Sequence, residues 1–114
     1  MEVTIMRIDL QKLYTSSTEY FDLNGSVIMK LSMEAALAVC AQALERGFVV
    51  ARIEGGVWHN PGFEARLDCI WDGVQPPCSR HAAQKNNLAA ADFIRSEQGQ
   101  HDVFVLSTVP IATQ

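Results

Sequence analysis

Three residues whose side chains can exchange protons lie close together in the sequence: His59, Glu64 and Asp68. An imidazole that is oriented by a carboxylate can act as a general base, so this group could in principle support acid–base catalysis. Catalysis would also require a nucleophile or a donor to a developing oxyanion, and the neighbouring residues indicate neither. A small enzyme or ligand-binding domain that uses these three residues is therefore our alternative hypothesis, and we expect no catalytic residue.

Motifs that commonly mark catalytic and metal sites are missing: the sequence has no Gly-rich phosphate loop and no GxSxG, HExxH or paired CxxC motif. The three histidines lie far apart, and the three cysteines lack metal-ligand spacing, so we expect neither a metal nor a cofactor. Cys40 and Cys69 fall on apolar faces and are expected in the core, as reduced thiols typical of the cytosol. Cys78 follows Pro76-Pro77 in an expected loop and is the thiol to test for reactivity.

The composition indicates a single globular domain, residues 1–114, which is large enough to bury a core. No run of about 18 apolar residues occurs, so we expect no membrane-spanning helix. The first residues lack the pattern of a secretion signal, which favours a cytoplasmic location. The formal net charge is −4 and no basic patch is visible, which disfavours direct binding to nucleic acid and is compatible with a basic protein partner.

The group around His59 lies in a stretch, Phe48 to Asp72, whose pattern predicts one β-hairpin with Asn60-Pro61-Gly62 as its turn. Strand side chains alternate between faces, so apolar residues at odd positions on both arms predict one apolar face. These positions are Val49, Ala51, Ile53 and Val57 on the first arm and Phe63, Ala65, Leu67, Cys69 and Trp71 on the second. A three-residue loop would keep odd positions opposite odd positions. The expected pairs are His59 with Phe63, Val57 with Ala65 and Ile53 with Cys69.

The even positions of the hairpin predict a second face that is charged and exposed to water. In the expected register Glu54 lies opposite Asp68 and diagonal to Arg66, and Arg52 lies diagonal to Asp68. Lattices of this kind are most often solvated surfaces whose ion pairs contribute little to stability.

Two features of this hairpin favour an interaction surface. Gly55-Gly56 leaves a gap that marks either a β-bulge or the close approach of another backbone. Trp58 stands beside the gap on the charged face, where a large aromatic side chain is typical of an interface, although it could instead cap the core. We expect Trp71 to pack in the core.

The remaining elements follow from periodicity and capping signals. Strands are predicted at Val3–Leu10 and Asp102–Thr108, and capped helices at Ser32–Arg46 and Ser79–Glu97, followed by stop signals at Gly47 and Gly99. Gln11 to Leu31 gives mixed signals: Tyr20 and Phe21 are expected anchors, Asn24-Gly25 a turn and Val27 to Leu31 a short strand. Asn86-Asn87, in the second helix, are expected to mark a kink or a polar contact.

The order of these elements predicts an α+β fold. We expect an antiparallel sheet of about four strands with two helices on one face, in the βαββαβ order of ferredoxin-like folds. The helices would cover the apolar face of the hairpin and leave its charged face open.

Three segments of the chain resemble a family of bacterial immunity proteins, the small cytosolic antidotes of polymorphic or contact-dependent growth-inhibition toxins. The segments are IEGGVWHNPGFEARLDCIWDG (Ile53 to Gly73), NNLAAADFI (Asn86 to Ile94) and HDVFVLST (His101 to Thr108). Including the helix before the hairpin, the similarity covers roughly Leu31 to Thr108.

The resemblance implies stoichiometric inhibition of a cognate toxin, often a nuclease with a basic active-site cleft, rather than turnover of a substrate. Carboxylates can imitate the phosphates of a nuclease substrate and speed the encounter with a basic protein. The residues that we expect to bind the toxin are Glu54, Trp58, His59, Glu64, Asp68 and Asp72, with Trp58 as the candidate hot spot. A homodimer that forms through the open sheet face is an alternative use of the same surface.

Overall fold

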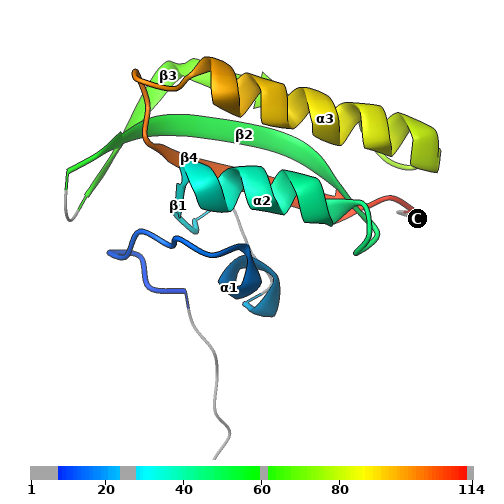
Figure 1. Ribbon diagram of the computed structural model, residues 1–114, viewed down its shortest axis with the longest axis horizontal. Coiled ribbons are helices and arrows are strands. Elements are labelled where there is room, and N and C mark those ends of the chain that lie inside the picture. The colour runs from blue at the N-terminus through cyan, green and yellow to red at the C-terminus, as the bar shows by residue number, and fades with distance from the viewer. Residues whose placement is uncertain (1–7, 24–27, 60–61, 113–114) are drawn as a thin grey trace, which may run out of the picture.

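The computed structural model describes residues 8–23, 28–59 and 62–112, which form one antiparallel sheet and three helices (Figure 1). The strands are β1 (Leu31–Ser32), β2 (Phe48–Trp58), β3 (Phe63–Asp72) and β4 (Val103–Pro110), in the sheet order β1-β4-β2-β3. The helices are α1 (Ser17–Asp22), α2 (Met33–Ala43) and α3 (Arg80–Ser96). No helix in these ranges is long and apolar enough to cross a membrane.

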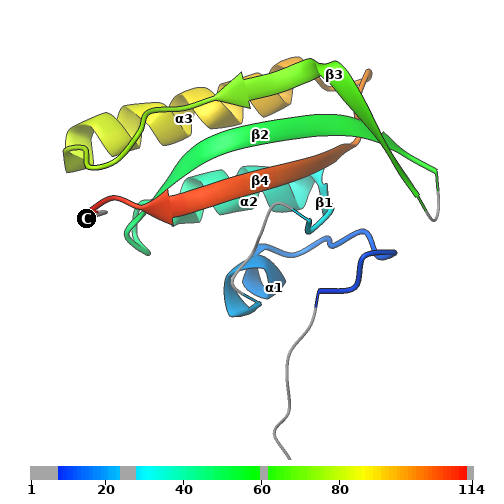
Figure 2. The same cartoon turned by 180° about the vertical axis from the view of Figure 1, so that it is seen from behind.

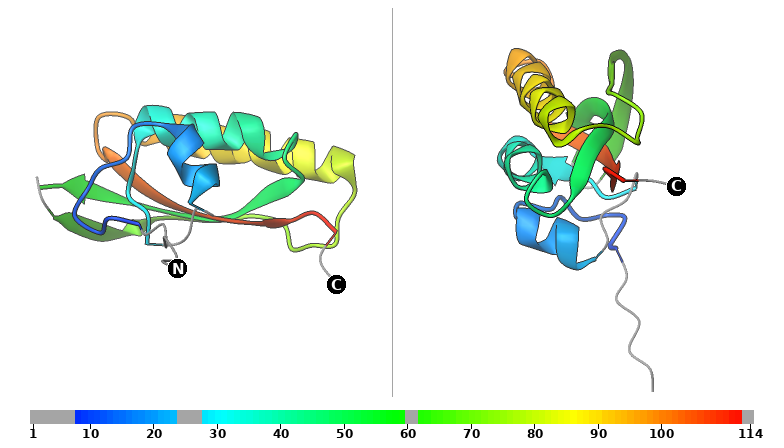
Figure 3. Two further views of the ribbon diagram at one scale, coloured as in Figure 1. Left: turned by 90° about the horizontal axis from the view of Figure 1, so that it is seen from below. Right: turned by 90° about the vertical axis from the view of Figure 1, so that its right-hand side faces the viewer.

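The helices α2 and α3 lie side by side on one face of the sheet, as the view from below shows (Figure 3). The opposite face carries no helix in the described part of the chain (Figure 2). The predicted α+β class and the two-helix layer are therefore confirmed.

Each long helix connects two strands that are separated by a third strand. α2 joins β1 to β2 across β4, and α3 joins β3 to β4 across β2. From β1 to β4 the element order is the predicted βαββαβ, and these crossovers have the form of split βαβ units. Among the described residues, the strand that opens this order is β1. Of the predicted strand Val3–Leu10, residues 8–10 form no strand, and residues 3–7 lie outside the described residues. The specific ferredoxin-like topology stays a prediction.

Both long helices begin where the capping residues predicted. The Ser32 hydroxyl accepts a hydrogen bond from the Ala35 N–H, and the Ser79 hydroxyl accepts one from the Ala82 N–H. These bonds satisfy backbone donors that have no partner inside the helix. α2 ends at Ala43, three residues before the predicted end, and a turn leads to Gly47, whose φ of 82° suits glycine.

The segment that gave mixed signals contains α1, which the sequence did not predict. Tyr20 and Phe21 are anchors as expected: the Tyr20 ring is buried and its hydroxyl donates to the Leu106 carbonyl at 3.1 Å. The same hydroxyl lies 3.0 Å from the Thr108 hydroxyl, so the N-terminal segment is tied to β4. The predicted strand at Val27 to Leu31 is reduced to β1, and the Asn24-Gly25 turn lies outside the described residues.

The core lies between the sheet and the helices. Its large fully buried members come from every part of the described chain: Tyr20, Met29, Leu31, Val39, Val50, Ile53, Cys69, Ile94, Phe104 and Leu106. Phe48, Trp71 and Phe93 pack against it from the edges, which confirms the core position expected for Trp71.

A bulge in β2 makes one sequence prediction wrong. The pairing of β2 with β4 shifts between Val50 and Arg52, so Val50 and Ile53 both point into the core although they are three residues apart. Val49 is buried outside this core, and Ala51 is half-buried. The odd positions of β2 therefore do not share one face, because a bulge reverses the alternation of side chains.

The predicted register of the hairpin is also wrong. Trp58 pairs with Phe63, so the connection has four residues, and beyond a second irregularity at Glu54/Gly56 the register shifts until Ile53 pairs with Trp71. The predicted three-residue loop implied one constant register along the whole hairpin. In the structure, the irregularity at Glu54/Gly56 places extra residues on β3 and shifts the register. Odd positions again face odd positions only beyond the bulge.

Asn86 and Asn87 hold α3 to the bulge in β2. The Asn87 side-chain carbonyl accepts from the Val50 N–H at 2.9 Å, and the Asn86 amide donates to the Val50 carbonyl at 2.8 Å. The side-chain carbonyl of Asn86 also accepts from the Val74 N–H at 2.9 Å. The predicted polar contact is therefore confirmed, and it gives hydrogen-bond partners to backbone groups of Val50 and Val74.

Candidate functional site

The tip of the hairpin carries three charged or titratable side chains in contact. His59 directly follows β2, and its Nε2 lies 2.8 Å from Glu64 Oε1 at the start of β3. The other carboxylate oxygen of Glu64 lies 3.1 Å from Arg66 Nη2 on the same strand. The turn brings His59 and Glu64 together, because the backbone N–H of His59 donates to the Gly62 carbonyl. The predicted pairing of these two site residues is thus present in the structure.

The electrostatics of this tip favour an ionised Glu64. The hydrogen bond from His59 is the main cause that lowers the pKa of Glu64, and the charge of Arg66 adds to it. The side chains of His59 and Glu64 are 55% and 48% exposed, so water screens the pair. A pair this open to water is better suited to contact a partner than to catalyse a reaction.

A second charged group lies further along the hairpin, where Arg52 joins two of the predicted site residues. Arg52 Nη1 lies 2.6 Å from Asp72 Oδ1, and Arg52 Nε lies 3.9 Å from Glu54 Oε2. Arg52 and Asp72 are paired directly across the two strands. The predicted lattice is therefore wrong in detail: Glu54 lies opposite Ile70 rather than Asp68, because of the bulge.

The two remaining predicted residues lie between or beside these groups. Asp68 is exposed on β3, outside both ion-pair groups. Trp58 is half-buried, and its backbone N–H donates to the Asp102 carboxylate at 3.0 Å. The structure thus arranges the six residues as two groups along one hairpin rather than as a single cluster. Arg52 and Arg66 are predicted on the charged face but not among the binding residues. In the structure these two arginines form the ion pairs of the two groups.

Both alternatives predicted for Gly55-Gly56 are found, but the gap is filled by the protein itself. A β-carbon on Gly55 would collide with Cys69 Sγ, and one on Gly56 would collide with the Glu64 carbonyl and the Phe63 ring. The glycines are needed for the bulge and the close approach of β3. The two glycines therefore allow close packing within the protein, and the space beside them is already filled by Cys69, Phe63 and Glu64.

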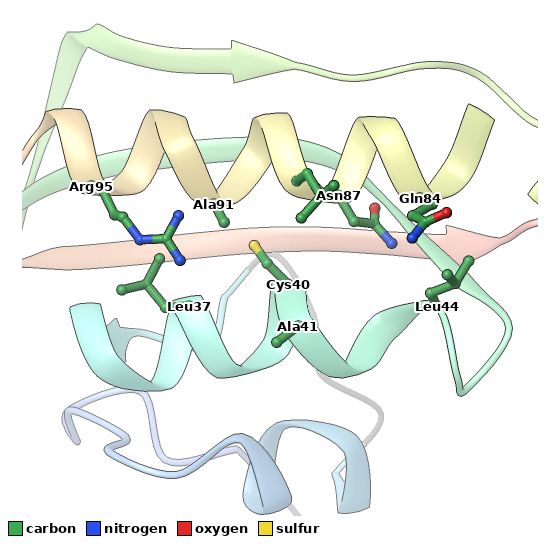
Figure 4. Close-up of a pocket in the computed structure, with 9 residues that line it drawn as sticks. Leu37, Cys40, Ala41, Leu44, Gln84, Asn87, Ala91 and Arg95 are labelled. Atoms are coloured by element: carbon green, nitrogen blue, oxygen red, sulfur yellow. The ribbon is translucent and has the colours of Figure 1, made fainter. Parts of the chain in front are cut away.

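A shallow groove of about 200 Å³ lies on the other side of the molecule, between α2 and α3 (Figure 4). It is lined mainly by apolar and amide side chains: Leu37, Cys40, Ala41, Leu44, Gln84, Asn87, Leu88, Ala91 and Arg95. Burial raises the pKa of the Cys40 thiol to about 12, so this thiol is not a ready nucleophile. The groove has the hydrophobic character of a contact or ligand site without groups that could carry out chemistry.

The structure also brings together three residues that sequence reasoning left apart. Cys69 on β3, Glu97 at the C-cap of α3 and His101 before β4 place one potential metal ligand each within 4.8 Å of the others. The expectation of no metal site relied on spacing, and it overlooked Glu97, four residues before His101. Cys69 comes from a distant strand and carries no such signal.

Comparison with known proteins identifies the family to which the chain belongs. The family model described as Colicin-E5 Imm protein matches residues 29–109, which span the sheet and both long helices. The chain belongs to this family of bacterial immunity proteins. It is 62% identical over 106 residues to the immunity protein CdiI of Burkholderia pseudomallei, covering 93% of this chain and 97% of the relative. It is 31% identical over 80 residues to the colicin-E5 immunity protein of Escherichia coli, covering 69% of this chain and 96% of that protein. The predicted resemblance is confirmed.

Proposed function

We propose that this immunity protein neutralises its cognate toxin by binding it through the charged side chains of the β2–β3 hairpin. Membership of the family supports inhibition of a toxin, and we propose that the chain acts by binding and not by catalysis. The contact residues in the proposal are those of the two charged groups, together with Trp58 and Asp68. The observation that carries the proposal is the position of these groups on a hairpin whose outer face no described helix covers.

The charge balance of the hairpin supports a basic partner. Its carboxylates are Glu54, Glu64, Asp68 and Asp72, against the guanidinium groups of Arg52 and Arg66. Because each guanidinium is engaged by a carboxylate, a negative surplus faces the solvent. Such a surface steers a basic protein toward it and suits a nuclease toxin whose cleft normally holds phosphates. We place this binding in the cytoplasm, as the family resemblance implies.

The same features have a structural explanation that the experiment must separate from binding. β3 is an edge strand, and charged side chains on an edge strand discourage pairing with other chains. If the charges serve only this purpose, reversing one of them will not weaken binding to the toxin.

The test is titration calorimetry of the chain with the toxin encoded by the adjacent upstream gene. We expect tight one-to-one binding that weakens when Glu64→Lys reverses a charge at the hairpin tip. The matched control is Asp92→Lys, which reverses an exposed, arginine-paired carboxylate on α3. Tight binding that is equally strong in both variants would contradict the hairpin site but keep the inhibitory function. Absence of binding by the wild-type chain would contradict the pairing with that toxin. Sedimentation of the free chain would show whether a homodimer covers the same face.

A further inference from the structure

The three residues that converge beneath the hairpin form a mixed sulfur, nitrogen and oxygen cluster. They are supplied by three separate elements: Cys69 by β3, Glu97 by the end of α3 and His101 by the connection to β4. Cys69 is fully buried, His101 is 8% exposed and the Glu97 side chain is 17% exposed. The cluster therefore lies inside the protein, next to the hairpin and away from its exposed ion pairs.

The imidazole of His101 has a buried nitrogen that lacks a hydrogen-bond partner. Within the described residues, His101 Nδ1 is the buried side-chain nitrogen that makes no hydrogen bond. It lies 3.3 Å from Glu97 Oε1, but the contact lacks hydrogen-bond geometry. An unpaired polar atom at this depth costs stability, so such atoms usually have a ligand, a water or a function.

We propose that Cys69, Glu97 and His101 bind one Zn²⁺ ion, with water as a fourth ligand. Thiolate, imidazole and carboxylate together are a ligand set that favours Zn²⁺ over Mg²⁺ or Ca²⁺. Ligand atoms at the corners of a zinc tetrahedron stand roughly 3.3–3.8 Å apart, given Zn–S and Zn–N bonds of about 2.3 and 2.0–2.1 Å. The separation of 3.3 Å between His101 Nδ1 and Glu97 Oε1 already matches one edge. Cys69 Sγ lies within 4.8 Å of one ligand atom of each of the other two residues. A shift on the order of 1 Å would bring it to the separation that a zinc tetrahedron requires.

Charge and proton balance are satisfied at this site. Binding replaces the thiol proton of Cys69, which leaves for the solvent, and forms a bond from sulfur to zinc. A thiolate, a carboxylate and a neutral imidazole then neutralise the two positive charges of the ion, as burial requires. Burial and the neighbouring Glu97 raise the pKa of Cys69 to about 12 in the metal-free chain. Metal affinity must therefore fall as the pH is lowered and protons compete for the ligands.

The backbone around the cluster is arranged to hold it. The His101 N–H donates to the Glu97 carbonyl at 3.0 Å, and the Asp102 N–H donates to the Gly56 carbonyl at 3.1 Å. A cavity of about 160 Å³ lined by Val57, Gly99, Gln100, His101 and Asp102 borders the imidazole. A bound ion would join the edge strand β3 to the end of α3 and the start of β4. It would thus stiffen the hairpin without taking part in the proposed toxin contact.

The test uses the untagged full-length chain, stripped with a chelator and titrated with Co²⁺ and then Zn²⁺. We expect one Co²⁺ per chain, a near-ultraviolet band from sulfur-to-cobalt charge transfer, loss of the band when Zn²⁺ displaces the cobalt, and a higher melting temperature with Zn²⁺. Cys69→Ser should abolish the band, and His101→Asn should weaken binding at least about tenfold. Cys40→Ser and Cys78→Ser are the matched controls and should keep both the band and the affinity.

Glu97→Gln provides a second route if the Cys69 variant fails to fold, since it keeps the shape of a partly exposed side chain. It should lower affinity while the charge-transfer band remains. A wild-type chain without the band, or one that binds Co²⁺ as well after Glu97→Gln and His101→Asn, would overturn the proposal.

Discussion

Asn87 on α3 accepts a hydrogen bond from the backbone N–H of Val50, which sits at the bulge of β2. The Asn87 amide also donates to the Phe48 carbonyl at 3.2 Å and shares its oxygen with the amide of Asn86. A side chain in the middle of a helix thus supplies hydrogen-bond partners to the backbone of β2 beyond the last residue pair of β2 with β3. The relationship explains why two weak helix formers stand together at buried positions of α3.

Replacing Asn87 should therefore destabilise the fold. For Asn87→Ala we expect a loss of about 1–3 kcal/mol in the free energy of unfolding, because the Val50 N–H is left buried without an acceptor. Urea unfolding followed by circular dichroism measures this loss. The control is Gln84→Ala on the exposed side of the same helix, which should change stability by less than about 0.5 kcal/mol. Alanine is the better helix former at both positions, so helix propensity cannot cause a loss in either variant. Equal losses would therefore contradict a specific role for the contact between Asn87 and Val50.

The second prediction concerns the glycine at the irregularity between β2 and β3. Gly56→Ala should destabilise by about 1–3 kcal/mol or more, because the added methyl group collides with the Glu64 backbone and the strands must separate. Gly99→Ala is an informative comparison, since its β-carbon meets open space and the cost comes only from a φ of 90°, roughly 1–2 kcal/mol. Only Gly56→Ala should also shift the amide resonances of Phe63 and Glu64, which two-dimensional NMR would detect.

The third prediction is the pH dependence of the hairpin tip. The folded-state pKa of Glu64 lies below its ordinary value, so the pair with His59 stabilises the folded state at pH values above the ordinary glutamate pKa. This contribution is lost as the pH falls through the lowered pKa and the carboxylate takes up a proton. An NMR titration of the Glu64 carboxyl carbon should show the lowered pKa in the wild type. His59→Gln should move it upward, and an unchanged value would contradict the contact.

The fourth prediction concerns the cysteines. Cys40 and Cys69 are buried, with pKa values raised to about 12, whereas Cys78 is half-exposed. In the folded, chelator-treated chain a thiol reagent should modify Cys78 first and the other two only after unfolding, as thiolate reactivity requires access and deprotonation. Mass spectrometry of the modified peptides checks the order. Rapid modification of Cys69 without unfolding would show that the strand β3 opens locally.

The sequence by itself determined the elements whose signals are local. Ser32 and Ser79 cap helices because their hydroxyls reach backbone donors three residues away, and the alternation of apolar residues in Phe48 to Asp72 defines a hairpin. These signals, and the order of elements that they give, were sufficient to predict the α+β class. The resemblance to immunity proteins was likewise carried by contiguous segments.

Only the tertiary structure decided the relationships that depend on register and on distant elements. The bulge at Val50 changes which residues of β2 face the core. No local sequence pattern predicts this bulge, because the side chain that hydrogen-bonds to Val50 comes from α3, 37 residues further along the chain. The pairing of Arg52 with Asp72 follows from the separate shift in the register of β2 with β3 at Glu54/Gly56. The meeting of Cys69 with His101 follows from the arrangement of β3, α3 and β4. Strand alternation fixes the faces of a strand only until an extra residue is inserted, and the energy that favours the insertion comes from packing elsewhere in the fold.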